Sequence, residues 1–158
     1  MSRAATPYES GDVVATPDGR GVVLATRAEG FSFPQEGHDH ADVEASPERP
    51  AFVVALEEGG SATYREGALE PTTFGETDLP EPKDERVTDV VDEEVDSGDR
   101  LPEGMDRREA LEYWSDLGGS WSACVSDRED ELGEQEAEAQ CTAIKDLLSG
   151  TERWREHF

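Results

Sequence analysis

The chain has 158 residues, a formal net charge of −25 and 34% hydrophobic residues. So acidic a surface repels phosphate, which argues against generic binding to nucleic acids and to anionic membrane surfaces. The apolar runs are shorter than the ~20 residues that a membrane helix needs, and the first residues lack the apolar stretch of a secretory signal.

The acidity has two interpretations, a disordered acidic chain or a folded protein adapted to molar salt. Molar salt screens charge repulsion within about 3 Å. The acidic residues lie in segments that also carry apolar patterning, and only Lys83 and Lys145 among the 14 basic residues are lysines. We therefore favour a folded halophilic protein, and we expect it to lose stability when the salt is diluted.

The first apolar segments predict a β-hairpin. Val13 and Val14 form one run, Val22 to Leu24 form a second, and Pro17–Asp18–Gly19 supplies turn residues between them. The polar stretch that follows, residues 28–50, is too long for a tight turn and rich in turn-forming residues. We expect it to be a loop.

The next segments predict two more strands and a short final piece. Ala51–Leu56 is an apolar run, Gly59–Gly60 marks a turn, and a strand is expected around Tyr64, followed by a piece near Leu69. Four or five short strands suit a small barrel, whose closure removes exposed strand edges. The expected barrel core consists of Val13, Val22, Leu24, Val53, Val54, Leu56 and Tyr64.

Residues 76–103 are expected to form an acidic, extended linker. Carboxylates dominate this stretch, and three prolines interrupt it. Its like charges repel one another, and an extended chain of ~3.3 Å per residue can span several tens of Å. A thin set of valines, including Val87 and Val91, hints that part of the segment docks on another surface.

Residues 104–158 predict a small unit of three helices. Apolar residues recur at helical spacing, and the stops are Gly118–Gly119, Gly133 and Gly150. The expected core or interface positions of this helical module are Leu111, Trp114, Trp121, Val125, Leu132, Ile144, Leu148 and Trp154. For the tryptophans, core packing is the preferred interpretation and a subunit contact is the alternative.

The two cysteines are placed to meet across a helical hairpin. Cys124 lies nine residues before Gly133 and Cys141 eight after it, and residues equidistant from the turn of an antiparallel hairpin lie opposite one another. A bond between them would contribute roughly 3 kcal/mol. The alternative is two buried free thiols that pack as small hydrophobes.

Nothing in the sequence assembles a catalytic centre. Walker, HExxH and Gly-x-Ser-x-Gly motifs are absent. His38 and His40 could hold a metal with the carboxylate between them, but a solvated loop is the preferred interpretation, and His157 is expected to be exposed. We therefore expect a non-enzyme with no cofactor and no metal.

The strand segments resemble a known small fold. The Gly-Asp before the first strand and the Gly-x-Gly-Val-Val of the second, in "GDVVATPDGRGVVLAT", are similar to an SH3-like or Tudor-like barrel. Such barrels serve mostly as binding or assembly modules. The expected class is α+β, with an SH3-like barrel over 1–75, a linker over 76–103 and a helical module over 104–158.

The helical segment carries a second and more specific resemblance. It is similar to a module in proteins encoded by haloarchaeal tailed viruses and proviruses, near their head-assembly genes. The matching residues are Leu101–Gly104, Gly118–Gly119, Trp121, Cys124, Cys141, Ile144–Asp146 and Gly150–Arg155. The resemblance implies a virion component and carries over no catalytic residue.

These features together predict a structural protein of a virus particle. We expect a minor capsid or decoration protein that is assembled in the host cytoplasm, oligomeric in the particle, and bound to the major capsid protein or other virion proteins, without direct contact to nucleic acid or membrane. One alternative is a head-tail connector or adaptor ring. Another is a soluble intracellular adaptor whose barrel binds a peptide.

Overall fold

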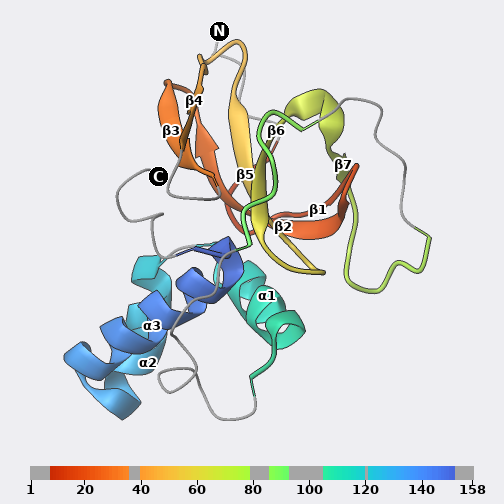
Figure 1. The fold of residues 1–158 in the computed structure, drawn as a ribbon. Helices are drawn as coiled ribbons and strands as arrows, with labels where there is room; N and C mark the ends of the chain where they lie inside the picture. Colours follow the sequence, from red (N-terminus) through yellow and green to blue (C-terminus); the bar gives the residue numbers. More distant parts are fainter. Residues whose placement is uncertain (1–7, 36–39, 79–85, 93–104, 120, 152–158) are drawn as a thin grey trace, which may run out of the picture.

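The computed structural model describes residues 8–35, 40–78, 86–92, 105–119 and 121–151, with the strands first in the chain and the helices last (Figure 1). The elements are β1 (Val13–Thr16), β2 (Gly19–Arg27), β3 (Phe31–Pro34), β4 (His40–Val43), β5 (Ala51–Leu56), β6 (Ser61–Arg65), the 3-10 helix η2 (Glu66–Ala68), β7 (Glu70–Pro71), α1 (Arg107–Asp116), α2 (Trp121–Leu132) and α3 (Glu134–Ser149). The predicted α+β class is confirmed.

The main sheet is antiparallel, with the strand order β6–β5–β2–β1–β7. The predicted hairpin is present, because β1 and β2 pair from Val13 with Val22 to Thr16 with Gly19. Strand β2 shifts its register between Val23 and Ala25, and such a bulge bends a strand. Within the described residues the sheet does not close, since β6 and β7 are its outer strands.

The stretch 28–50 contains a second, two-stranded sheet, so the prediction of a loop is wrong. Phe31 of β3 pairs with Val43 of β4. Phe33 and Val43 are buried and belong to the protein's core. Their apolar positions are sparse in the sequence, and these strands are stabilised by packing on distant residues, which local β-propensity does not report.

Strand β5 is buried on both faces, so its side chains contribute to two apolar clusters on opposite sides of the main sheet. Its side chains alternate in direction along the strand. Those of Phe52, Val54 and Leu56 join one apolar cluster, while those of Ala51, Val53 and Ala55 join another. The first, the inner cluster, comprises Val14, Val23, Phe52, Val54, Leu56, Ala62, Tyr64, Ala68 and Leu69.

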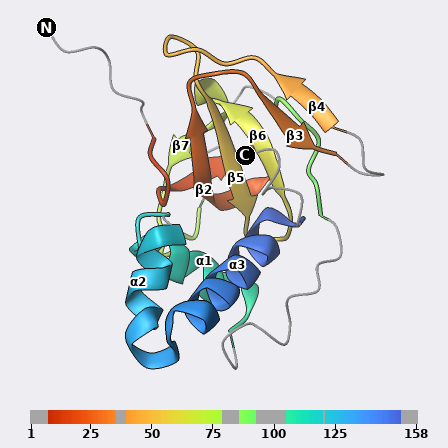
Figure 2. The same cartoon turned by 90° about the vertical axis from the view of Figure 1, so that its left-hand side faces the viewer.

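The second cluster extends from the sheet into the helices. This shared cluster comprises Val22, Leu24, Phe33, Val43, Ala51, Val53, Ala55, Val91, Ala110, Leu111, Trp114, Cys124, Cys141, Ile144 and Leu148. Figure 2 shows the helices gathered against one end of the sheet. The predicted barrel and the predicted helical module therefore do not have separate cores, because apolar residues of the sheet and of the helices join one cluster.

The predicted barrel core divides between the two clusters. Val54, Leu56 and Tyr64 lie in the inner cluster. Val22, Leu24 and Val53 belong to the shared cluster, and Val13 is partly buried against it. The sequence could not separate these residues, because a strand covered on both faces is apolar at every position.

Two pairs of glycines bring the helices close to the strands. A Cβ on Gly119 would lie 2.5 Å from the amide nitrogen of Gly11, and a Cβ on Gly150 would lie 2.7 Å from the Cα of Gly60. At both places backbone meets backbone with no room for a side chain. The sequence predicted Gly119 and Gly150 as helix stops, and they also determine how closely the helices approach the sheet.

Residues 86–92 of the predicted linker lie along β6 (Figure 1). Ser61 and Val91 exchange backbone hydrogen bonds of 3.0 and 2.8 Å, and the Val87 amide donates to the Thr63 carbonyl at 2.7 Å. Val91 is fully buried. The valine hint is confirmed here, and this part of the segment pairs with an edge strand whose polar groups would otherwise be open.

A substitution at Thr88 tests whether the pairing of residues 86–92 with β6 stabilises the protein. The Thr88 Oγ1 accepts a buried hydrogen bond of 2.9 Å from the Thr63 amide. We expect Thr88→Val to lower the free energy of unfolding by about 1–3 kcal/mol, since the Thr63 amide is left unpaired. Thr73→Val is the matched control, because Thr73 makes the same kind of contact with the Gly75 amide at an exposed position. Urea unfolding of both variants measures the difference, and equal losses would contradict the account.

Candidate functional site

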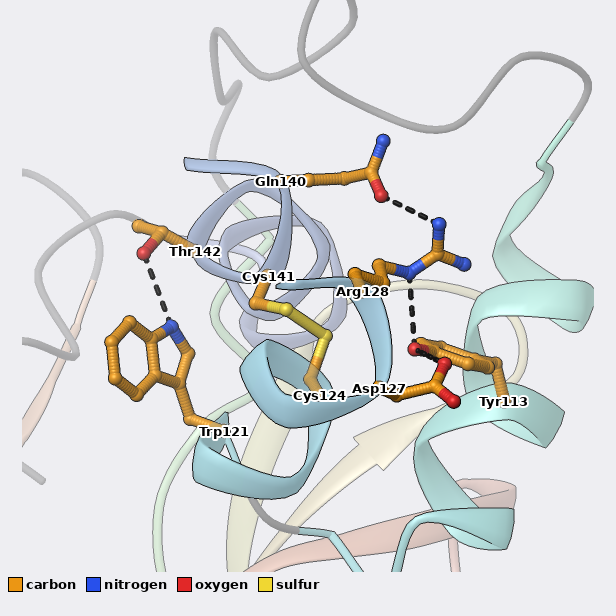
Figure 3. The surroundings of a disulfide bond; sticks show 8 residues. All are labelled: Tyr113, Trp121, Cys124, Asp127, Arg128, Gln140, Cys141 and Thr142. Carbon is orange, nitrogen blue, oxygen red and sulfur yellow. Dashed lines mark hydrogen bonds between the residues drawn. A yellow bond between two sulfur atoms is a disulfide. The ribbon is translucent and has the colours of Figure 1, made fainter. Parts of the chain in front are cut away.

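The two cysteines form a disulfide between α2 and α3, as the hairpin geometry predicts (Figure 3). Their Cα atoms are 5.9 Å apart, and both residues are fully buried. The prediction of a bonded pair is confirmed, and the alternative of two free thiols is wrong. The bond joins α2 to α3, and α3 in turn packs against β5.

Polar contacts flank the disulfide along the same two helices (Figure 3). Trp121 Nε1 donates to Thr142 Oγ1 at 3.2 Å, and Arg128 Nη1 donates to Gln140 Oε1 at 2.6 Å. Each of these four side chains is partly buried. The α2–α3 contact therefore has one covalent link at its centre and a hydrogen bond on either side.

Tyr113 connects α1 to the same hairpin. Its hydroxyl donates to Asp127 Oδ2 at 2.7 Å and accepts from Arg128 Nε at 3.0 Å. The guanidinium of Arg128 also lies 4.6 Å from the centre of the Tyr113 ring, a cation–π contact. Burial, followed by the hydrogen bond to Asp127, raises the pKa of Tyr113, so the hydroxyl stays a donor at neutral pH.

Arg107 joins the helices to the sheet from within. Its guanidinium donates to four backbone carbonyls, two at the end of α3 and two around the β5–β6 turn: Leu147, Leu148, Leu56 and Gly60, at 2.5, 2.9, 2.7 and 2.8 Å. Burial lowers the pKa of Arg107 to about 10, so it remains charged at neutral pH. A cation at the carboxyl end of a helix is also favoured by the helix dipole.

A second group of arginines surrounds Phe74. The guanidiniums of Arg20 and Arg108 lie 5.5 and 4.7 Å from the centre of its ring. Glu57 forms ion pairs with both, at 2.6 Å to Arg20 and 3.5 Å to Arg108. The hydrogen bond from Arg20 is the main cause of a lowered pKa at Glu57. The sequence shows no signal for this group, because its members come from four separate segments.

Two surface cavities have arginines in their walls. One of about 390 Å³ is lined by Pro17, Arg86, Val87, Thr88 and Asp89, and one of about 240 Å³ by Glu44, Ala45, Ser46, Arg49 and Arg65. In the first, Arg86 pairs with Asp18 at 2.8 Å. In the second, Arg65 donates to backbone carbonyls that include that of Arg49, at 2.9 Å. Both guanidiniums thus have structural partners.

The tip of the α2–α3 hairpin is the most acidic part of the described structure. We define the hairpin tip as residues 127–138, which carry seven carboxylates and a single cation, Arg128. Six of the seven carboxylate residues are exposed and Glu138 is partly buried. This face presents dense negative charge to solvent or to a partner.

The predicted core or interface positions of the helical module differ in how deeply they are buried. Leu111, Trp114, Ile144 and Leu148 are buried, whereas Trp121, Val125 and Leu132 are partly buried. Trp154, His38 and His157 lie outside the described residues. His40 is exposed, 3.9 Å from Asp42, and the described residues contain no group of three or more His, Cys, Asp or Glu placed to hold a metal ion.

Trp114 is the largest fully buried side chain of the described residues. Its burial shows why α1 cannot leave the sheet without opening the shared cluster. We expect Trp114→Ala to lower the free energy of unfolding by about 3–5 kcal/mol. Chemical denaturation followed by circular dichroism measures this loss, and a loss below about 1 kcal/mol would contradict the assignment.

Comparison with protein-family models, curated proteins and solved structures found no significant match for this chain. In the part of the chain that the structure describes, no helix combines the length and the apolar character needed to cross a membrane.

Proposed function

We propose that this protein is a structural component of a haloarchaeal tailed-virus particle, of the minor capsid or decoration type. One observation carries the proposal: sheet and helices share a single apolar cluster and are fastened together by Arg107 at their junction. A rigid body of this kind loses little conformational freedom when it binds, which favours tight docking onto an assembly.

The net charge supports the same proposal. A charge of −25 is compatible with a folded protein where molar salt screens repulsion. The resemblance of residues 101–155 to a module of haloarchaeal tailed viruses is an independent sequence argument for the same setting. The partners under this proposal are the major capsid protein or other virion proteins.

The strand arrangement supports the SH3-like part of the proposal. The order β6–β5–β2–β1–β7, with the 3-10 helix η2 before a last strand that pairs with the first, is compatible with an SH3-like barrel, although β6 and β7 do not pair with each other in the described residues. In this proposal the inner cluster is the interior of that barrel and the helices cover its outer face. The binding surface then combines strands and helices rather than belonging to the sheet alone.

The proposed mechanism is cementing by one rigid body. Two modules joined by an extended linker would gain avidity from linkage. Because residues 86–92 pair with β6 and both parts share a core, the tether mechanism is replaced. A single body that touches two neighbouring capsid subunits resists their separation at both contacts.

Quantitative mass spectrometry of purified particles tests the proposal. The particles come from the virus or induced provirus that carries the coding sequence, and they are kept in molar salt throughout. The proposal predicts that the protein is present at a copy number that matches the capsid lattice. A few copies would replace it with the connector ring, and absence from the particles would reject it in favour of the intracellular adaptor.

A further inference from the structure

Helix α2 is held to the protein by little buried surface. Cys124 is the only fully buried residue among the described residues of α2, and Trp121, Val125 and Leu132 are partly buried. Helix α3, by contrast, buries seven residues, including Ile144 and Leu148. Because burial of apolar area supplies most of the free energy of packing, α2 depends on its covalent link far more than α3 does.

Helix α3 has attachments to the sheet that do not involve α2. Ser61 of β6 donates to the carbonyl of Ser149, and Arg107 donates to the carbonyls of Leu147 and Leu148. Gly150, which ends the helix, lies directly against Gly60. These contacts hold the carboxyl-terminal half of α3 on the sheet independently of α2.

The hairpin tip carries carboxylates at equivalent sequence positions on α2 and α3, with Arg128 as the single cation among residues 127–138. Asp127 follows Cys124 by three residues and Glu138 precedes Cys141 by three. Glu131 and Glu134 are likewise each seven residues from the disulfide. In an antiparallel hairpin that places carboxylate opposite carboxylate, and such pairs repel one another. Repulsion between these carboxylates would act against the hydrogen bonds that Asp127 and Arg128 make with Tyr113, and it grows as the salt is diluted and the screening length increases.

We propose that α2 is a flap held closed by the Cys124–Cys141 bond. In dilute salt, a dithiol reductant reduces this bond and the flap opens. The inference concerns the fold and stands whether or not the protein belongs to a virus particle. It assigns the disulfide a conformational role, since the bond opposes the repulsion at the hairpin tip.

The chemistry of opening is a thiol–disulfide exchange. A thiolate of the reductant attacks one cysteine sulfur and forms a mixed disulfide, and the second thiol of the reductant then displaces that cysteine. The protein gains two electrons and two protons as two thiols, and the reductant becomes a cyclic disulfide. Both sulfurs are buried, so the attack requires a local opening of α2, which repulsion in dilute salt makes more frequent.

The rate of reduction by dithiothreitol tests the salt dependence. The intact protein is treated in molar salt and at the lowest salt at which the amides of β5 remain protected from hydrogen exchange, and free thiols are counted by alkylation and mass spectrometry. We expect reduction to be at least roughly tenfold faster at the lower salt. Equal rates at the two salt concentrations would overturn the proposal.

A pair of charge variants separates the hairpin tip from the net charge. Glu131→Gln with Glu134→Gln removes two opposed carboxylates, and Glu66→Gln with Glu70→Gln removes two exposed ones around η2 and β7. We expect only the first variant to slow reduction in dilute salt. Equal slowing by both variants would show a general charge effect and overturn the role of the hairpin tip.

Hydrogen exchange of the disulfide-free protein tests the flap itself. In Cys124→Ser with Cys141→Ser, in molar salt, we expect the amides of α2 to exchange roughly a hundredfold faster, while those of β5 and of the end of α3 keep their protection. Unchanged protection of α2 would overturn the proposal. So would an equal loss in α2 and β5, because the helix would then not move independently.

Discussion

Diluting the salt from about 3 M to about 0.1 M is expected to lower the thermal midpoint of this protein by roughly 10–20 °C. The reason is the net charge of −25 on a chain of 158 residues. The screening length grows from about 3 Å or less to about 10 Å over this range. We expect repulsion to remove on the order of 5 kcal/mol from a typical total of about 5–15 kcal/mol.

Circular dichroism melts across a salt series measure this shift. Sucrose at low salt is the control, because it favours the compact state by exclusion from the protein surface and does not screen charge. We expect sucrose to restore only a small part of the lost stability. A midpoint independent of salt would contradict the halophilic interpretation, and full recovery in sucrose would contradict screening as its cause.

Replacing Gly119 by alanine is expected to destabilise the protein far more than the same change at Gly118. The two neighbours have nearly equal φ angles, +73° and +75°. A left-handed backbone costs alanine about 1–2 kcal/mol at either position. At Gly119 the added Cβ would also lie 2.6 Å from the backbone carbon of Ser10, so the segment after α1 must move away from the residues that precede β1. That displacement adds about 2–3 kcal/mol.

Gly118 is a close control, because nothing lies within 4 Å of the Cβ that alanine would add there. Urea unfolding of the two single variants isolates the cost of the contact from the cost of the backbone angle. If the paired variants lose equal stability, the close approach of helix and strand is wrong.

The helices and most strands of the main sheet could be predicted because their signals are local. Proline and aspartate at a turn, apolar residues at helical spacing and glycine stops each act within a few residues. The disulfide could be predicted for a related reason. A hairpin that turns at Gly133 places Cys124 and Cys141 opposite each other whatever the rest of the chain does.

The shared core could not be predicted, because its contacts join segments far apart in the sequence. Nothing around Val22 or Val53 tells which face of the sheet the helices cover. In the sequence, Arg107 is an ordinary charged residue at the start of a helix. In the structure it donates hydrogen bonds to backbone carbonyls that are 40 to 51 residues away in sequence. The strands β3 and β4 were missed for the same reason, since Phe33 and Val43 are buried by distant partners.

Native-state hydrogen exchange in molar salt tests most directly whether the protein is one rigid body, on which cementing depends. The shared cluster predicts that amides of β5 and of the end of α3, around Ile144 and Leu148, open with the same free energy, that of global unfolding. Exchange at the end of α3 at a much lower free energy, while β5 stays protected, would contradict it, because the sheet and the helices would then be separate bodies.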